Sequence, residues 1–216
     1  LIDTAGLRRK SKVTNKVEKL STHDTYRAIQ YAQLVVLVLD GSSMLEKQDL
    51  TIARQVIDEG RILVIAVNKW DSVNDKKSSL QSLEYRLENS LTQVRGIPVV
   101  KLSALTGNGV QKLLPEAFKY FDLWNRRVPT GKLNRWLEMM TERHPPPLVN
   151  GRRVRLRYIT QARTRPPTFV VFSSRGNSLP EDYRRYLTNG IRENFRLPGV
   201  PIRLLVRQGY NPYGSD

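Results

Sequence analysis

The chain of 216 residues contains no cysteine, which excludes disulfide bonds and thiolate metal sites and fits a reducing cytoplasm. It has no apolar run of membrane-spanning length and no charged-then-apolar leader, so we expect a protein without a membrane span.

Acidic residues are scarce in the second part of the chain. Residues 126–216 contain 18 Lys and Arg against 6 Asp and Glu, whereas residues 1–125 contain 18 against 14. The balance of +12 after residue 126 predicts contact with a polyanion, of which nucleic acid is the commonest soluble example.

A short apolar run at residues 62–67 ends in Asn68, Lys69, Trp70 and Asp71. Such a run predicts a buried parallel strand, and ligands of open α/β sheets lie beyond the carboxyl ends of these strands. The four residues fit the guanine-reading N-K-x-D motif of GTPases. The Asp71 carboxylate can accept hydrogen bonds from the ring N1 and the exocyclic amine of guanine, a donor pair that adenine lacks. The Asn68 amide can serve N7, and the Lys69 stem can cover the base. An ordinary polar turn after a strand is the alternative.

Two further motifs stand in the order found in GTPases. Asp3 and Gly6 match a D-x-x-G element, in which the aspartate works through the magnesium shell and the glycine amide contacts the terminal phosphate. Ser103 and Ala104 follow the next predicted strand, where an S-A element would read the guanine carbonyl oxygen through a backbone amide. Two letters carry little information alone, but their placement after the other two motifs favours a GTPase-type nucleotide site.

Other parts of a GTPase site are missing from the sequence. No G-x-x-x-x-G-K-[ST] phosphate loop occurs, and Leu7 stands where many GTPases have a water-orienting glutamine. Residues 7–20 are basic and predict a solvated loop or, after a D-x-x-G element, a switch loop. Without the strand of the phosphate loop, the apolar strand at residues 34–40 has an unpaired edge. We therefore expect the intact protein to contain the missing strands, and an intact mass near 24.9 kDa would contradict this.

Strand-like and helical apolar patterns alternate before residue 126, which predicts a parallel sheet covered on both faces. A capping box formed by Ser21 and Asp24 is predicted to begin the first helix. The predicted strands are 34–39, 62–67 and 97–102, and the predicted helices are 26–30, 46–59, 80–94 and one that starts at 110. The last helix is predicted to bury Leu113, Leu114, Ala117, Phe118 and Phe121.

The second part predicts a smaller α+β domain after a junction at residues 126–131. Thr130 is predicted to cap a helix that ends at Pro145, and further elements are a strand around 153–158, a strand at 168–172, a helix opened by Pro180 and a strand at 202–206. This order resembles the KH RNA-binding fold. However, no two glycines in the chain are three residues apart, so the G-x-x-G loop that clamps RNA is absent.

Three arginines, Arg153, Arg155 and Arg157, are predicted to share one face of the first strand of this domain, opposite Val154, Leu156 and Tyr158. Like charges at this spacing repel each other unless something anionic meets them, so a merely solvated face is disfavoured. We expect this face to contact RNA or the ribosome, with packing against another domain of the protein as the alternative.

Taken together, the chain resembles the bacterial ribosome-assembly GTPases of the Der (EngA) family, which carry two GTPase domains followed by a KH-like domain without G-x-x-G. The resemblance is carried by residues 3–10, 48–49, 68–71, 103–110, 145–147 and 209–213. The fold class that it implies is α/β, an incomplete P-loop GTPase-type parallel sheet with helices on both faces, followed by a small α+β KH-like domain. The expected domains are residues 1–127, a partial GTPase domain without phosphate loop and first switch, and residues 128–216.

The resemblance implies GTP hydrolysis by the parent protein, GTP or GDP with Mg²⁺ and K⁺ as cofactors, a cytoplasmic location and a role in assembly of the large ribosomal subunit. Its nucleotide-binding residues would be Asp3, Gly6, Asn68, Lys69, Asp71, Ser103 and Ala104, with Asp3 holding Mg²⁺ through water. The implied partners are the large subunit or its rRNA and the protein's own missing GTPase domain, in a protein that is monomeric when complete. No catalytic residue is identified in this chain, and turnover by the chain alone is not expected. The alternative is a non-catalytic RNA- or ribosome-binding module with relic guanine-reading loops.

Overall fold

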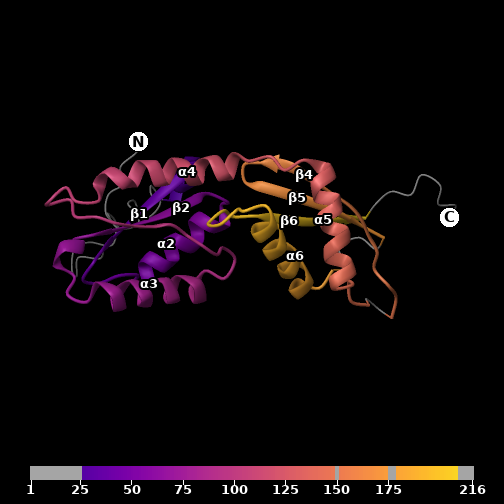
Figure 1. Ribbon diagram of the computed structural model, residues 1–216, viewed down its shortest axis with the longest axis horizontal. Coiled ribbons are helices and arrows are strands. Elements are labelled where there is room, and N and C mark those ends of the chain that lie inside the picture. Colours follow the sequence, from indigo (N-terminus) through magenta and orange to yellow (C-terminus); the bar gives the residue numbers. More distant parts are fainter. Residues whose placement is uncertain (1–25, 149–150, 175–178, 209–216) are drawn as a thin grey trace. The chain divides into compact units, whose positions relative to one another are not determined.

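The computed structural model describes residues 26–148, 151–174 and 179–208. The chain divides into two compact units between Phe121 and Asp122, and each is described by itself (Figure 1). The domain boundary expected at residues 127 and 128 stays a prediction. Among the residues described, no helix combines the length and apolarity that a bilayer crossing needs. The predictions for Asp3, Gly6, Leu7, Ser21 and Asp24 fall outside the described residues.

A three-stranded parallel sheet forms the centre of the first unit. Its strands are β1 (Leu34–Asp40), β2 (Ile62–Asn68) and β3 (Val99–Lys101), in the order β1-β2-β3. The first two agree with the prediction, whereas the third is shorter than expected. Pairing nevertheless extends beyond β3, because Ile65 N donates to Pro98 O at 2.9 Å and Leu102 N donates to Val67 O at 2.9 Å.

The helices of the first unit follow the predicted order. Residues 26–31 are helical, and the others are α2 (Lys47–Asp58), α3 (Lys76–Ser90) and α4 (Leu113–Asn125), with short 3₁₀ helices η1 (Trp70–Ser72) and η2 (Val110–Lys112). At the start of α3, Asp75 Oδ1 accepts from Ser78 N at 3.0 Å and satisfies one of the otherwise unpaired amides of the first turn. The third helix was predicted to reach residue 94 but ends at Ser90, and the buried Val94 lies in the turn that follows.

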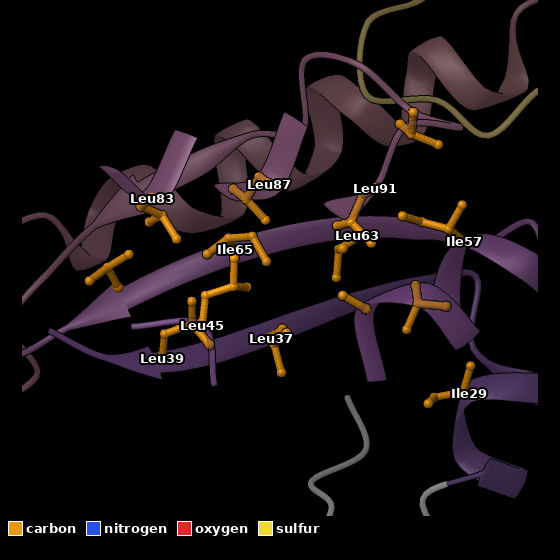
Figure 2. Close-up of a cluster of buried hydrophobic side chains, with 14 residues drawn as sticks. Ile29, Leu37, Leu39, Leu45, Ile57, Leu63, Ile65, Leu83, Leu87 and Leu91 are labelled. Atoms are coloured by element: carbon orange, nitrogen blue, oxygen red, sulfur yellow. The ribbon is translucent and has the colours of Figure 1, made fainter. Parts of the chain in front are cut away.

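The main hydrophobic cluster of this unit lies on one face of the sheet. Successive strand residues point to opposite faces, so Leu63, Ile65 and Val67 of β2 meet the helices α2 and α3 on that side. Figure 2 shows Leu63 and Ile65 in one cluster with Leu83 and Leu87 of α3. On the opposite face, Ile62, Val64 and Ala66 of β2 are also buried, and α4 runs along that side in Figure 1. The predicted α/β class with helices on both faces is confirmed.

One prediction for α4 is wrong. Leu114 and Phe118 were expected to be buried but are 61% and 63% exposed. The helix instead buries Ala117 and Tyr120 in this unit, and the Tyr120 hydroxyl donates to Gly96 O at 3.2 Å. Its buried Trp124 belongs to the second unit. Two apolar stripes at helical spacing compete on this helix, and contacts with the rest of the unit decide between them.

The second unit is a small α+β fold with the predicted element order. It contains α5 (Thr130–Arg143), β4 (Leu156–Thr164), β5 (Pro167–Ser173), α6 (Glu181–Asn194) and β6 (Arg203–Gln208). The sheet order is β4-β5-β6, with β4 antiparallel and β6 parallel to β5. The helices α5 and α6 pack closely where Gly190 lies, since a Cβ there would be 3.0 Å from Trp136 Cζ2.

Two local predictions in this unit are wrong. Pro129, not Thr130, is the N-cap of α5, and Thr130 is its first helical residue. The strand expected at 153–158 begins only at Leu156, and its pairing with β5 shifts between Leu156 and Tyr158, which leaves Arg157 as an extra residue. Such a bulge changes which side chains share a face, so Tyr158 is 39% exposed although Val154 is buried. The arginines at positions 153, 155 and 157 are all exposed.

Candidate nucleotide-binding site

The polar residues that the sequence singled out gather at the carboxyl ends of β1, β2 and β3. Register pairs Asp40 with Asn68 at the ends of β1 and β2, and Ser103 follows the end of β3. This edge of a parallel sheet is the place where ligands of open α/β folds lie. The fold therefore brings together side chains that are up to 63 positions apart, from Asp40 to Ser103.

Asn68 connects the end of β2 to the loop after β3. Its Oδ1 accepts from Lys69 N at 2.8 Å and from Ala104 N at 2.9 Å. Two backbone donors on the same atom identify it as the amide oxygen, so the orientation of the side-chain amide is fixed by its hydrogen bonds. The Nδ2 group is then the donor end, which is the end needed for an acceptor such as a purine N7.

Asp71 lies in η1, which is tied to the neighbouring strand by the hydrogen bond from Trp70 N to Leu102 O at 3.1 Å. The carboxylate accepts from the hydroxyl of Ser103 and from Ser72 Oγ, the latter at 3.1 Å. The hydrogen bond from Ser103 is the main cause that lowers the pKa of Asp71 below its ordinary value. Asp71 is thus an ionised, exposed acceptor at neutral pH.

Ser103 is a buried hydrogen-bond partner of Asp71. It is 2% exposed, and its Oγ accepts from Thr106 N at 3.2 Å while its hydroxyl donates to Asp71. The loop turns back on itself through the hydrogen bonds from Ser103 N to Asn108 O at 2.8 Å and from Gly107 N to Ser103 O at 2.9 Å. The structure therefore places Ser103 as a support of the Asp71 carboxylate. Its predicted contact with nucleotide stays a prediction.

The glycine at position 109 sets the shape of this loop. Its φ is +80°, and a Cβ at this position would lie 2.2 Å from Lys101 O. Only glycine tolerates both the backbone conformation and the approach. The loop 103–109 is consequently pressed against the end of β3, which keeps Ser103 and Ala104 near β2.

Lys69 and Asp40 form an ion pair that was not predicted from the sequence. Lys69 Nζ lies 2.7 Å from Asp40 Oδ2, and Asp40 Oδ1 accepts from Ser42 N at 2.9 Å and from Ser42 Oγ at 2.7 Å. The hydrogen bond from Lys69, followed by those from Ser42, holds the pKa of Asp40 far below its ordinary range. The only available sequence signal was the placement of Asp40 at the end of an apolar run, which does not name a partner 29 residues away.

The arrangement supplies what a purine reader needs, namely an oriented amide donor, an ionised carboxylate and a lysine stem beside them. It does not supply a metal site, because the described part of the chain contains no group of three or more His, Cys, Asp or Glu able to hold a metal ion. Asp3, the predicted magnesium residue, and Gly6 lie outside the described residues. The predicted contact residues Arg153, Arg155 and Arg157 belong to the second unit.

Comparison with known proteins agrees with this geometry. A family model described as "KH-domain-like of EngA bacterial GTPase enzymes, C-terminal" matches residues 127–207, and one described as "Elongation factor Tu GTP binding domain" matches residues 21–122. The chain is 54% identical over 215 residues to GTPase Der of Parvibaculum lavamentivorans, covering 100% of the chain and 46% of the relative. GTPase Der of Novosphingobium aromaticivorans is 52% identical over 215 residues, covering 100% and 47%.

The chain therefore spans about half the length of the curated relatives that it matches. Among solved structures, Era of Aquifex aeolicus bound to GDP·AlF4⁻ overlaps 98% of the chain and 76% of its own length, with a TM-score of 0.45 and 15% identity.

Proposed function

Because the chain belongs to the GTPase Der family, we propose that the protein of which it is part is a guanine-nucleotide-dependent GTPase, and that this chain carries the guanine-selecting half of the site. The observation that carries the proposal is the convergence of Asn68, Asp71 and Ala104 on one sheet edge, with the Asn68 to Ala104 hydrogen bond at 2.9 Å joining β2 to the loop after β3.

Guanine selection follows from donors and acceptors. An ionised Asp71 carboxylate is acceptor-only, so it complements the N1 hydrogen and the exocyclic amine of guanine and repels the N1 lone pair of adenine. The Nδ2 group of Asn68 donates to N7. The Ala104 amide, predicted to read the guanine carbonyl oxygen, donates to Asn68 in the structure, so that role would require this proton to be shared between two acceptors.

The phosphate end of the nucleotide needs groups that this chain does not contain. We place those contacts, including the phosphate loop and the first switch, in the part of the relatives' length that this chain does not span. Asp3 and Gly6 would complete that half, with Mg²⁺ and K⁺ neutralising the phosphates when bound. Among the described strands, β1 lies at one edge of the sheet, which supports a further strand beside it in the complete protein. Val38 of β1 is 56% exposed, which supports a further element covering that face of the sheet.

We further propose that the protein acts in assembly of the large ribosomal subunit and that the second unit meets ribosomal RNA. The charge of +12 on residues 126–216 supports this, as do the three strands β4, β5 and β6, which contain no acidic residue. The alternative, packing of Arg153, Arg155 and Arg157 against another domain of the protein, predicts that RNA affinity is independent of these side chains. Replacing all three by Gln should weaken binding to ribosomal particles and reduce its salt dependence, whereas replacing the exposed Lys76, Lys77 and Lys112 should not.

Equilibrium titration of the complete protein with GDP, IDP and ADP tests the guanine proposal. IDP keeps the N1 hydrogen but lacks the exocyclic amine, so one hydrogen bond to a charged acceptor is lost and affinity should fall about 10- to 100-fold relative to GDP. ADP should bind more weakly still. Equal affinities for the three nucleotides, or no binding, would favour the alternative of a non-catalytic RNA-binding module with relic loops.

A further inference from the structure

Lys69 is held both by its backbone N and by the ammonium at the end of its side chain. Its backbone N donates to Asn68 Oδ1 at 2.8 Å, and its ammonium lies 2.7 Å from Asp40 Oδ2. The backbone has φ of 58°, in the left-handed region that residues other than glycine seldom adopt. Because the side chain is 63% exposed, its ordering comes from this anchor rather than from burial.

Asp40 is a rigid anion. Its side chain is only 12% exposed, and Oδ1 accepts from the backbone N and the hydroxyl of Ser42, so that Oδ2 faces Lys69. The pKa of Asp40 lies far below its ordinary value because of these hydrogen bonds, so the carboxylate remains charged at any pH at which the protein would be assayed. The lysine thus meets a partner with a fixed position and a fixed charge.

Gly41 brings this anion to the guanine-reading segment. Gly41 N donates to Asn68 O at 2.8 Å, and a Cβ at position 41 would lie 3.0 Å from that oxygen and 2.8 Å from Val73 Cγ2. The end of β1 can therefore lie against the residues that follow β2 only because residue 41 has no side chain. Asp40 is therefore positioned for Lys69 by three features, namely the register of β1 with β2, the absence of a side chain at Gly41 and the hydrogen bonds from Ser42.

We propose that Asp40 is a positioning residue for guanine-nucleotide binding, which holds the Lys69 stem extended along the sheet edge before the base arrives. An exposed lysine otherwise samples many rotamers, and ordering it on binding would weaken affinity. With its ammonium anchored, the methylene stem forms a preformed surface for the base. The inference rests on the proposed guanine-binding function and adds to it a residue on the neighbouring strand.

A double-mutant cycle in the complete protein tests this inference. Fluorescently labelled GDP is titrated into the wild type, Asp40→Asn, Lys69→Met and the double variant, and the unfolding midpoint of each is recorded. Asp40→Asn should weaken GDP about 3- to 10-fold, the range expected for losing one solvent-exposed ion pair that orders a binding group. In the Lys69→Met background, Asp40→Asn should have no further effect, because Asp40 acts through the lysine. Asp40→Glu, which keeps the carboxylate, should bind within about twofold of the wild type.

Glu116→Gln is the matched control, since it removes an exposed carboxylate paired with Lys119 at 2.9 Å on α4 and should leave GDP affinity unchanged. The inference is overturned if Asp40→Asn binds GDP as tightly as the wild type or more tightly. It is equally overturned if Asp40→Asn weakens binding by the same factor with and without Lys69, or if Asp40→Glu is as weak as Asp40→Asn. Failure of the proposed function looks different, because the wild type itself would then show no preference for GDP over ADP.

Discussion

Asn68 performs two tasks that a pair of substitutions can separate. Its oxygen accepts from the amides of Lys69 and Ala104, and its Nδ2 is the proposed donor to N7. In Asn68→Ala both amides lose their acceptor. Each lost hydrogen bond at such a partly exposed position costs about 0.5 to 1.5 kcal/mol, so local opening of the Ala104 amide should become about 2- to 13-fold more frequent.

Asn68→Asp keeps an acceptor oxygen for both amides but replaces the donor Nδ2 by a second acceptor. It should leave exchange of the Ala104 amide within about threefold of the wild type, because the hydrogen bonds are retained. GDP affinity should nevertheless fall by about 10-fold or more, since a carboxylate oxygen would face the N7 lone pair.

Amide hydrogen exchange of the complete protein, resolved at residues 68 and 104, measures the first effect, and GDP titration measures the second. The reasoning is refuted if the Ala104 amide exchanges at the wild-type rate in Asn68→Ala. It is also refuted if Asn68→Asp binds GDP like the wild type, because the amide donor would then have no role.

Three further predictions follow from other contacts. Gly109→Ala should destabilise the loop 103–109 and weaken GDP binding, because its Cβ would lie 2.2 Å from Lys101 O. Gly107→Ala is the control, since Gly107 also has a positive φ but nothing lies within 4 Å of its Cβ, so that the cost in stability should be only about 1 kcal/mol. Equal unfolding midpoints for the two variants would contradict this. Gln161→Leu should destabilise the second unit by roughly 2 to 5 kcal/mol, measured by denaturant unfolding. The reason is that Gln161 is buried, its Oε1 accepts from Val128 N at 2.7 Å and its Nε2 donates to Arg126 O at 3.0 Å. A loss of stability below about 1 kcal/mol would contradict this prediction. Burial raises the pKa of Tyr183 to about 12. The contribution of the neutral Tyr183 side chain to stability is therefore complete below pH 10 and is lost as pH rises from 10 to 12. Ultraviolet titration should show a tyrosine that ionises near pH 12, and this ionisation should be absent in Tyr183→Phe.

The strands and the position of the polar residues 68–71 at the end of β2 were predictable because their signals are local. The run at residues 62–67 is apolar throughout, and a strand buried on both faces requires that. The polar residues 68–71 follow this run directly in the sequence, so the end of β2 and the residue types at that end could be predicted together. The same holds for β5, which was predicted at 168–172 and spans Pro167–Ser173.

Contacts between distant segments had no such signal. The pairing of Lys69 with Asp40 and of Asn68 with Ala104 depends on strand register, which the sequence of either strand alone does not specify. The exposed Phe118 of α4 was mistaken for core because its spacing fits a helix face as well as that of Tyr120 does. A bulge at Arg157 likewise has no marker in the residues around it.

The most direct test of the account is the nucleotide preference of Asp71→Asn in the complete protein, measured with GDP and xanthosine diphosphate in parallel. Asparagine offers a donor where xanthine carries an oxygen in place of the guanine amine. The variant should therefore lose affinity for GDP by roughly 100-fold or more and gain affinity for xanthosine diphosphate. If Asp71→Asn binds GDP as the wild type does and gains nothing for xanthosine diphosphate, the carboxylate at position 71 does not select the base.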